Sequence, residues 1–134
     1  MTDKIEAREF EETPEFREEI EKALAKNPEA VKLMADIDDA QDRYIEAQNQ
    51  AEEFEANMDM AEYDEDEAEN EADREEAQNR YIEARNQKEE AEANMDMAEY
   101  DEDKAKEKLS EIKKQIRLDF LKGRAMAKLV QFND

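Results

Sequence analysis

The sequence predicts an all-α fold, an elongated antiparallel helical hairpin of the coiled-coil type with a short N-terminal helix packed at its base. Two observations support the helices: no Gly or Pro occurs between Pro28 and Gly123, and Ala, Glu, Lys, Gln, Arg and Met, the strongest helix formers, dominate the chain. A third observation, a duplication of sequence, supports the hairpin.

The duplication joins two segments that are nearly identical. Residues 40–47 recur as residues 77–84, and residues 55–66 recur as residues 92–103, always with an offset of 37. This offset exceeds five heptads by two residues. In one continuous supercoiled helix, the apolar stripe of the second copy would therefore face the opposite side, so we expect the chain to bend between the copies.

Local signals place the elements in order along the chain. Residues 1–12 show no pattern and are predicted to form a flexible arm. The rest of the domain, residues 13–122, is predicted to hold a short helix at 14–26 that starts after Thr13, an arm at 28–69 capped by Asn27, a turn at 70–73 and a second arm at 74–122. Asn70 is expected to end the first arm, Asp73 to cap the second and Gly123 to end it, which leaves a docking tail at 123–134.

An apolar stripe with alternating spacings of three and four residues defines the predicted contact between the arms. It includes Ala30, Leu33, Ile37, Ala40, Tyr44, Ala47, Ala51, Phe54, Met58, Ala61, Glu65, Ala68, Ala72, Ala77, Tyr81, Ala84, Lys88, Ala91, Met95, Ala98, Glu102, Ala105, Leu109, Ile112 and Ile116. Folding the chain about residue 71 sets large residues opposite small ones along most of this stripe, for example Tyr81 opposite Ala61.

Charge is high and unevenly distributed. The net charge is −22 with 46% charged and 38% hydrophobic residues, a composition that is also found in disordered chains. Helix-forming composition with heptad spacing favours a coiled coil or long helix over disorder. Residues 38–103 carry a net charge of −22, whereas residues 104–134 carry +5, and this asymmetry indicates two surfaces with different roles.

The residues that catalysis requires are missing from the sequence. There is no His and no Cys, and Ser110 is the single Ser, so no activated nucleophile is predicted. The acidic runs 63–66 and 100–103 lack the Gly of a calcium-binding loop and are interpreted as solvated helix faces. We therefore expect no enzyme activity, no catalytic residue, no metal site and no cofactor.

A protein partner is expected at the C-terminal end. Large apolar residues gather there, flanked by basic ones: Phe120, Leu121, Lys122, Arg124, Lys128, Leu129, Val130 and Phe132. Unless they fold back on Phe16, Ile20 and Leu24, the apolar ones form an exposed patch suited to an acidic partner surface or to self-association. Met60 and Met97 lie off the stripe and are further candidates for a partner contact, whereas Arg43, Arg80 and Arg85 are expected to pair with nearby acids.

Direct binding of nucleic acid is not expected, because the acidic body would repel phosphate. No apolar run approaches the roughly 20 residues of a membrane span, and the N-terminus lacks the apolar core of a secretory signal. The expected location is the cytoplasm or the interior of a viral particle.

In composition the chain resembles small helical assembly proteins of bacteriophages, such as scaffolding and accessory virion components, which are also acidic and helical with a basic end. We expect a non-enzymatic structural or assembly protein that docks on a larger complex, such as a phage particle or scaffold, through its base and C-terminus, because apolar anchors and positive charge are concentrated at that end. The alternative hypothesis is an acidic DNA mimic that inhibits a DNA-binding protein, since spaced carboxylates can imitate the charge of duplex DNA.

Overall fold

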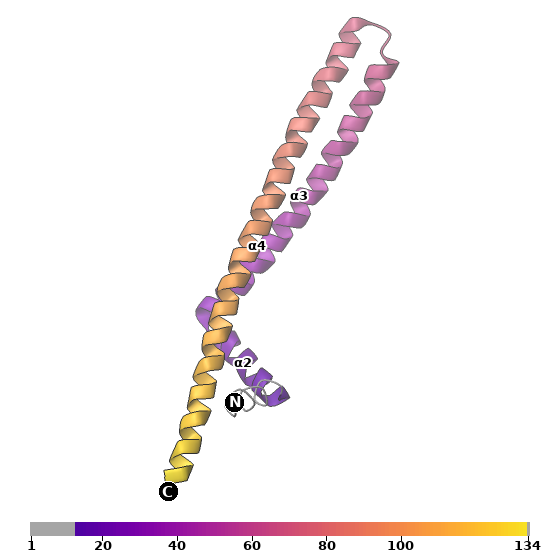
Figure 1. The fold of residues 1–134 in the computed structure, drawn as a ribbon. Helices are drawn as coiled ribbons and strands as arrows, with labels where there is room; N and C mark the ends of the chain where they lie inside the picture. The colour runs from indigo at the N-terminus through magenta and orange to yellow at the C-terminus, as the bar shows by residue number, and fades with distance from the viewer. Residues whose placement is uncertain (1–12, 134) are drawn as a thin grey trace, which may run out of the picture. The chain divides into compact units, whose positions relative to one another are not determined.

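The computed structural model describes residues 13–133, and it describes side chains over residues 13–124. This part of the chain forms three helices and no strand, which confirms the all-α fold: α2 spans Pro14–Lys26, α3 spans Pro28–Glu67 and α4 spans Glu71–Asn133 (Figure 1). Within the described residues, none of the helices has an apolar stretch long enough to cross a membrane.

The boundary between α2 and α3 lies at Asn27, as the sequence indicates. The Asn27 side-chain oxygen accepts hydrogen bonds from the backbone N–H groups of Glu29 and Ala30 at 3.0 and 3.1 Å. These two donors would otherwise have no partner within the helix, so this side chain caps α3. Pro28 fits the first helical position because its missing N–H is not needed there.

The turn between α3 and α4 comes earlier than the predicted residues 70–73, because α3 ends at Glu67 and α4 begins at Glu71. Asn70 does not end the first arm. Its side-chain oxygen accepts a hydrogen bond from the Asp73 backbone N–H at 2.8 Å, and its Nδ2 donates to the Asp73 carboxylate at 3.0 Å. Asn is as good an N-cap as it is a helix stop, and here it starts α4, so Asp73 lies inside the helix.

The second arm does not end at Gly123. The helix α4 continues through this residue to Asn133, and Gly123 has no positive φ. A helical Gly costs about 1 kcal/mol relative to Ala, which the surrounding Lys, Arg, Ala, Met and Leu residues are able to offset through their high helix propensity.

The described chain divides into two compact units, each considered by itself. The hairpin unit comprises residues 37–103. The three-helix unit comprises residues 13–36 of α2 and α3 and residues 104–133 of α4.

The three-helix unit has a small apolar core. Phe16 is fully buried, and Ile20, Leu24 and Ala30 are buried with it. Five apolar side chains of α4 pack against this group: Leu109, Ile112, Ile116, Phe120 and Leu121. The rings of Phe16 and Phe120 meet edge to face with 6.4 Å between their centroids, a favoured aromatic geometry.

In the hairpin unit, α3 and α4 lie side by side and run in opposite directions (Figure 1). Their contact is built on Ala: eight of these residues are buried between the arms, namely Ala40, Ala47, Ala51, Ala61, Ala77, Ala84, Ala91 and Ala98. Larger residues of the predicted stripe are half-buried, among them Tyr44, Phe54, Met58, Tyr81 and Met95. Small side chains let two helices approach closely, and the regular stripe explains why the sequence alone located the contact.

Candidate functional site: a duplicated face of the hairpin

The two sequence repeats make the same contacts with each other twice. Arg43 on α3 donates a hydrogen bond to Asp101 on α4 at 3.1 Å, and Arg80 on α4 donates one to Asp64 on α3 at 3.0 Å. Adding 37 to Arg43 gives Arg80, and subtracting 37 from Asp101 gives Asp64. The second ion pair is therefore the first one with the two repeats exchanged.

The acidic positions of the apolar stripe follow the same rule. The side-chain amide of Gln78 donates to Glu65 at 2.9 Å, and that of Gln41 donates to Glu102 at 3.2 Å. Each acid is half-buried at the contact between the arms, and an amide from the opposite arm donates a hydrogen bond to it. Exchanging the repeats again converts one pair into the other, so the hairpin unit has a local two-fold axis.

Matched exposure is a third sign of this symmetry. The hairpin unit exposes large apolar side chains in three repeat-related pairs: Met60 and Met97 at 66% and 64%, Tyr63 and Tyr100 at 66% and 61%, and Ile45 and Ile82 at 54% and 45%. Side chains this large and apolar gain free energy when a partner covers them.

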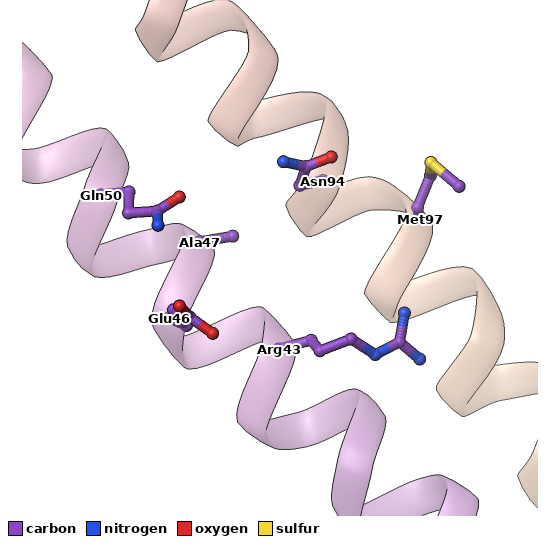
Figure 2. A pocket seen from close by; sticks show the side chains of 6 residues that line it. All are labelled: Arg43, Glu46, Ala47, Gln50, Asn94 and Met97. Atoms are coloured by element: carbon purple, nitrogen blue, oxygen red, sulfur yellow. The ribbon is translucent and has the colours of Figure 1, made fainter.

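Two grooves on the hairpin unit have repeat-related walls. One is lined by Arg43, Glu46, Ala47, Gln50, Asn94 and Met97, shown in Figure 2, where Arg43 extends from α3 towards α4. The other is lined by Asn57, Met60, Ala61, Arg80, Glu83, Ala84 and Gln87. Every residue of the first groove has its repeat counterpart in the second, and each groove has a volume of about 280 Å³.

Both grooves open on one face of the hairpin unit. Arg43 and Gln50 line the first groove and Asn57 lines the second, and these residues follow one another on α3 at heptad spacing. Residues seven apart share one side of a helix. We call this side the grooved face. Its groups are exposed carboxylates, amides, guanidinium groups and thioethers, which suit binding rather than covalent chemistry.

The Arg side chains of the grooved face are paired with carboxylates. Arg43 also bridges Asp39 on its own helix at 3.0 Å, and hydrogen bonding to Asp101 raises the pKa of the Arg43 guanidinium. Local pairing with Asp39 agrees with the sequence-based expectation, whereas the pairing across the arms to Asp101 was not foreseen. The hairpin unit contains 27 acidic and five basic residues, so most of its carboxylates face solvent without a cation.

The repeats differ at the contact between the arms in two places. Lys88 replaces Ala51 and Ala91 replaces Phe54 at equivalent positions. Lys88 is half-buried, and its Nζ lies 3.8 Å from Oε1 of Glu55 and 3.9 Å from Oε1 of Glu92. These differences fall on the stripe between the arms and leave the lining of both grooves unchanged.

The predicted docking residues lie partly inside the three-helix unit. Phe120 and Leu121 pack against its core, which is the fold-back alternative that the sequence left open. The Arg124 guanidinium lies 5.1 Å from the centroid of the Phe16 ring and donates to Glu19 at 2.9 Å. Lys122 is exposed. The side chains of Lys128, Leu129, Val130 and Phe132 lie outside the described residues.

Sequence reasoning named Met60 and Met97 but missed the grooves around them. The signal was present, because the offset of 37 and the pairing about residue 71 together imply that the arms exchange under a two-fold rotation. Comparison of the chain with protein families, with curated proteins and with solved structures finds no match.

Proposed function

We propose that this protein is a non-enzymatic binding protein whose acidic hairpin unit takes the place of duplex DNA on the basic surface of a DNA-binding protein. The observation that carries the proposal is the density of charge along the hairpin unit. The arm that α3 contributes, residues 37–67, is about 46 Å long at 1.5 Å per residue. A net charge of −22 over that length is one negative charge per roughly 2.1 Å.

Duplex DNA carries one negative charge per about 1.7 Å of its axis. A protein that binds phosphates with Lys and Arg would therefore meet a similar density of anions on the hairpin unit. The carboxylates are held in place by two packed helices, so binding them costs less ordering than binding an acidic disordered segment.

The packing of the three-helix unit weakens the hypothesis that the C-terminal residues form a docking surface. Phe120 and Leu121 complete the core of the three-helix unit, and Arg124 is engaged with Glu19 and Phe16. Their roles inside the unit explain why these residues are apolar and basic without invoking a partner.

A second candidate function is the structural or assembly role, with docking on a larger complex such as a phage particle. One observation favours it: the three-helix unit exposes Val31, Met34 and Leu118 at 47%, 37% and 50%. Exposed apolar side chains of this size are the kind that an assembly partner or a second copy of the chain covers.

Competition with DNA tests the first proposal. The full chain is immobilised and exposed to an extract of the cells that produce it, and bound proteins are eluted with a random-sequence 36-base-pair duplex at constant ionic strength. The first proposal expects the duplex to release the captured protein. Retention of every captured protein in the presence of excess duplex contradicts it.

Two variants separate the candidate functions. In the first, Glu46, Glu53, Glu83 and Glu90 are replaced by Gln, which removes four exposed charges from the grooved face with little change in shape. In the second, Val31 and Leu118 are replaced by Asp, which introduces charge at the exposed apolar side chains of the three-helix unit. The DNA-mimic proposal expects capture to fall in the first variant and persist in the second. The assembly proposal expects the opposite pattern.

A further inference from the structure

We propose that the partner of the hairpin unit is a homodimeric DNA-binding protein, whose own two-fold axis coincides with the local two-fold axis of the hairpin unit, so that each of its subunits engages one groove. This inference rests on the proposed DNA-mimic function and specifies the partner's symmetry. It follows from the grooved face, where one chain presents the same site twice.

The direction of the local axis decides what can bind. Because α3 and α4 run in opposite directions, the rotation that exchanges them has its axis perpendicular to both arms. Both grooves lie on one face, so this axis emerges through that face midway between them. Operator DNA presents its dyad axis to a dimeric protein in the same way, perpendicular to the duplex with one half-site on each side.

The spacing of the repeated groups sets the distance between the two contacts of such a dimer. Each of the two ion pairs contributes one residue of α3, Arg43 to the first pair and Asp64 to the second. These two residues are 21 positions apart on α3. At 1.5 Å per residue, the ion pair of Arg43 with Asp101 and that of Arg80 with Asp64 are about 32 Å apart along the hairpin unit. The grooves lie between these ion pairs and are closer together: Glu83 is level with residue 59 of α3, 13 residues from Glu46, so the two groove carboxylates are about 20 Å apart and each partner subunit would contact its groove about 10 Å from the shared axis.

The grooves offer such a partner more than charge. Each holds an exposed thioether, Met97 in one and Met60 in the other, next to an exposed carboxylate, Glu46 in one and Glu83 in the other. Met adapts to the shape of a partner surface, and the carboxylate attracts a basic side chain. One recognition element that fits the first groove also fits the second.

The negative charge of the hairpin unit disfavours a second copy of the chain or a nucleic acid as the partner. A second copy of this hairpin unit, whose net charge as a whole is −22, would be repelled by the first, and so would nucleic acid, which has a comparable density of phosphates. A basic protein is the occupant whose charge complements this face. A basic monomer is the remaining competitor, and the experiment distinguishes it from a dimer.

The first measurement is stoichiometry. The protein that is released by the 36-base-pair duplex is purified and mixed with the full chain, and the mass of the complex is measured by native mass spectrometry. We expect two identical partner subunits per chain. One partner subunit per chain, with capture still reversed by the duplex, overturns this inference but leaves the DNA-mimic function standing. If no captured protein is released by the duplex, both proposals fail.

The second measurement uses matched single substitutions. Glu46→Lys and Glu83→Lys reverse the charge at repeat-related positions of the two grooves. A symmetric dimer should lose affinity by about tenfold in each case, the two losses should agree within about a factor of two, and the double variant should lose about 100-fold, since distant sites contribute additively. A large loss for one substitution and none for the other contradicts a coincident two-fold axis.

Asp59→Lys and Asp96→Lys serve as controls for these variants. Each makes the same change of charge at an exposed repeat-related position. Asp59 and Asp96 each lie one residue before the Met that lines a groove, so each side chain points about 100° away from that Met around its helix. Helical circular dichroism verifies that all four variants remain folded. Affinity losses in the controls as large as in the groove variants overturn the assignment of the contact to the grooved face.

Discussion

Replacing Phe16 by Ala should destabilise the three-helix unit more than any other single truncation of its core. Phe16 is fully buried and its ring meets that of Phe120 edge to face. Removing a buried Phe side chain costs about 3–5 kcal/mol, because its transfer energy is lost and a cavity is left. The edge-to-face pair contributes about 0.5–1.5 kcal/mol of that sum, so the upper half of the range is expected here.

Urea denaturation followed by circular dichroism at 222 nm measures this change. Since domains are stabilised by only about 5–15 kcal/mol in total, the loss should appear as a clear shift of the midpoint to lower urea. Leu118→Ala is the control, because Leu118 lies on α4 of the same unit but is 50% exposed, and it should cost less than about 1 kcal/mol. A Phe16→Ala variant within 1 kcal/mol of wild type would refute the described packing of α2.

Three further predictions concern the helices. Raising the salt concentration from 0.01 to 1 M shortens the Debye length from about 30 to 3 Å. Because repulsion among the carboxylates of the hairpin unit is then screened, its melting temperature should rise, and a steady fall contradicts this. Asn70→Ala removes the cap that binds the Asp73 N–H and should cost about 1 kcal/mol in urea denaturation, whereas Asn49→Ala, at an exposed position within α3, should cost much less. Gly123→Ala should stabilise α4 by about 0.5–1 kcal/mol, because the added methyl group meets nothing within 4 Å beyond its chain neighbours and the backbone of its own helix, and φ is not positive; destabilisation would show that the helix does not continue there.

The sequence predicted the regular parts of the fold because they repeat. The apolar stripe has one period throughout, and its members from Ala30 to Ala68 and from Ala77 to Ile116 are buried or half-buried as expected. Asn27 was predicted to cap a helix because Asn is a favoured N-cap residue and Pro28, directly after it, fits the first helical position.

Single positions with two suitable conformations were harder to predict. Asn70 can end a helix or start one, and the hydrogen bond to Asp73 that decides between them depends on where the turn falls. Gly123 can end a helix but is also tolerated within one, so the glycine alone does not mark a boundary. Phe120 and Leu121 have the same sequence signature whether they are exposed or packed against Phe16, and only the position of α2 distinguishes the two.

The candidate site required information from both arms. Arg43 and Arg80 each have acidic neighbours in sequence, so local ion pairs accounted for them, and the pairings with Asp101 and Asp64 became evident only when the arms were placed side by side. The grooves are likewise made by pairs of helices and have no signature in either repeat alone.

The most direct test of the central claim, that the two repeats form the symmetric arms of one hairpin, is a pair of electron–electron distances. The native sequence has no Cys, so spin labels attach only to introduced ones. One variant carries labels at Asn49 and Ala93, and the other carries them at the repeat-related positions Asn86 and Ala56, all of which are exposed. Dilution with unlabelled chain verifies that each distance lies within one molecule.

The hairpin predicts two short distances of about 20 Å, since the labels lie on the outer sides of two helices packed 8–10 Å apart, and symmetry predicts that the two distributions coincide. One continuous helix would instead separate the labels by about 66 Å in the first variant and about 45 Å in the second, at 1.5 Å per residue. Either those long distances, or two short distances that clearly differ, would contradict the symmetric hairpin.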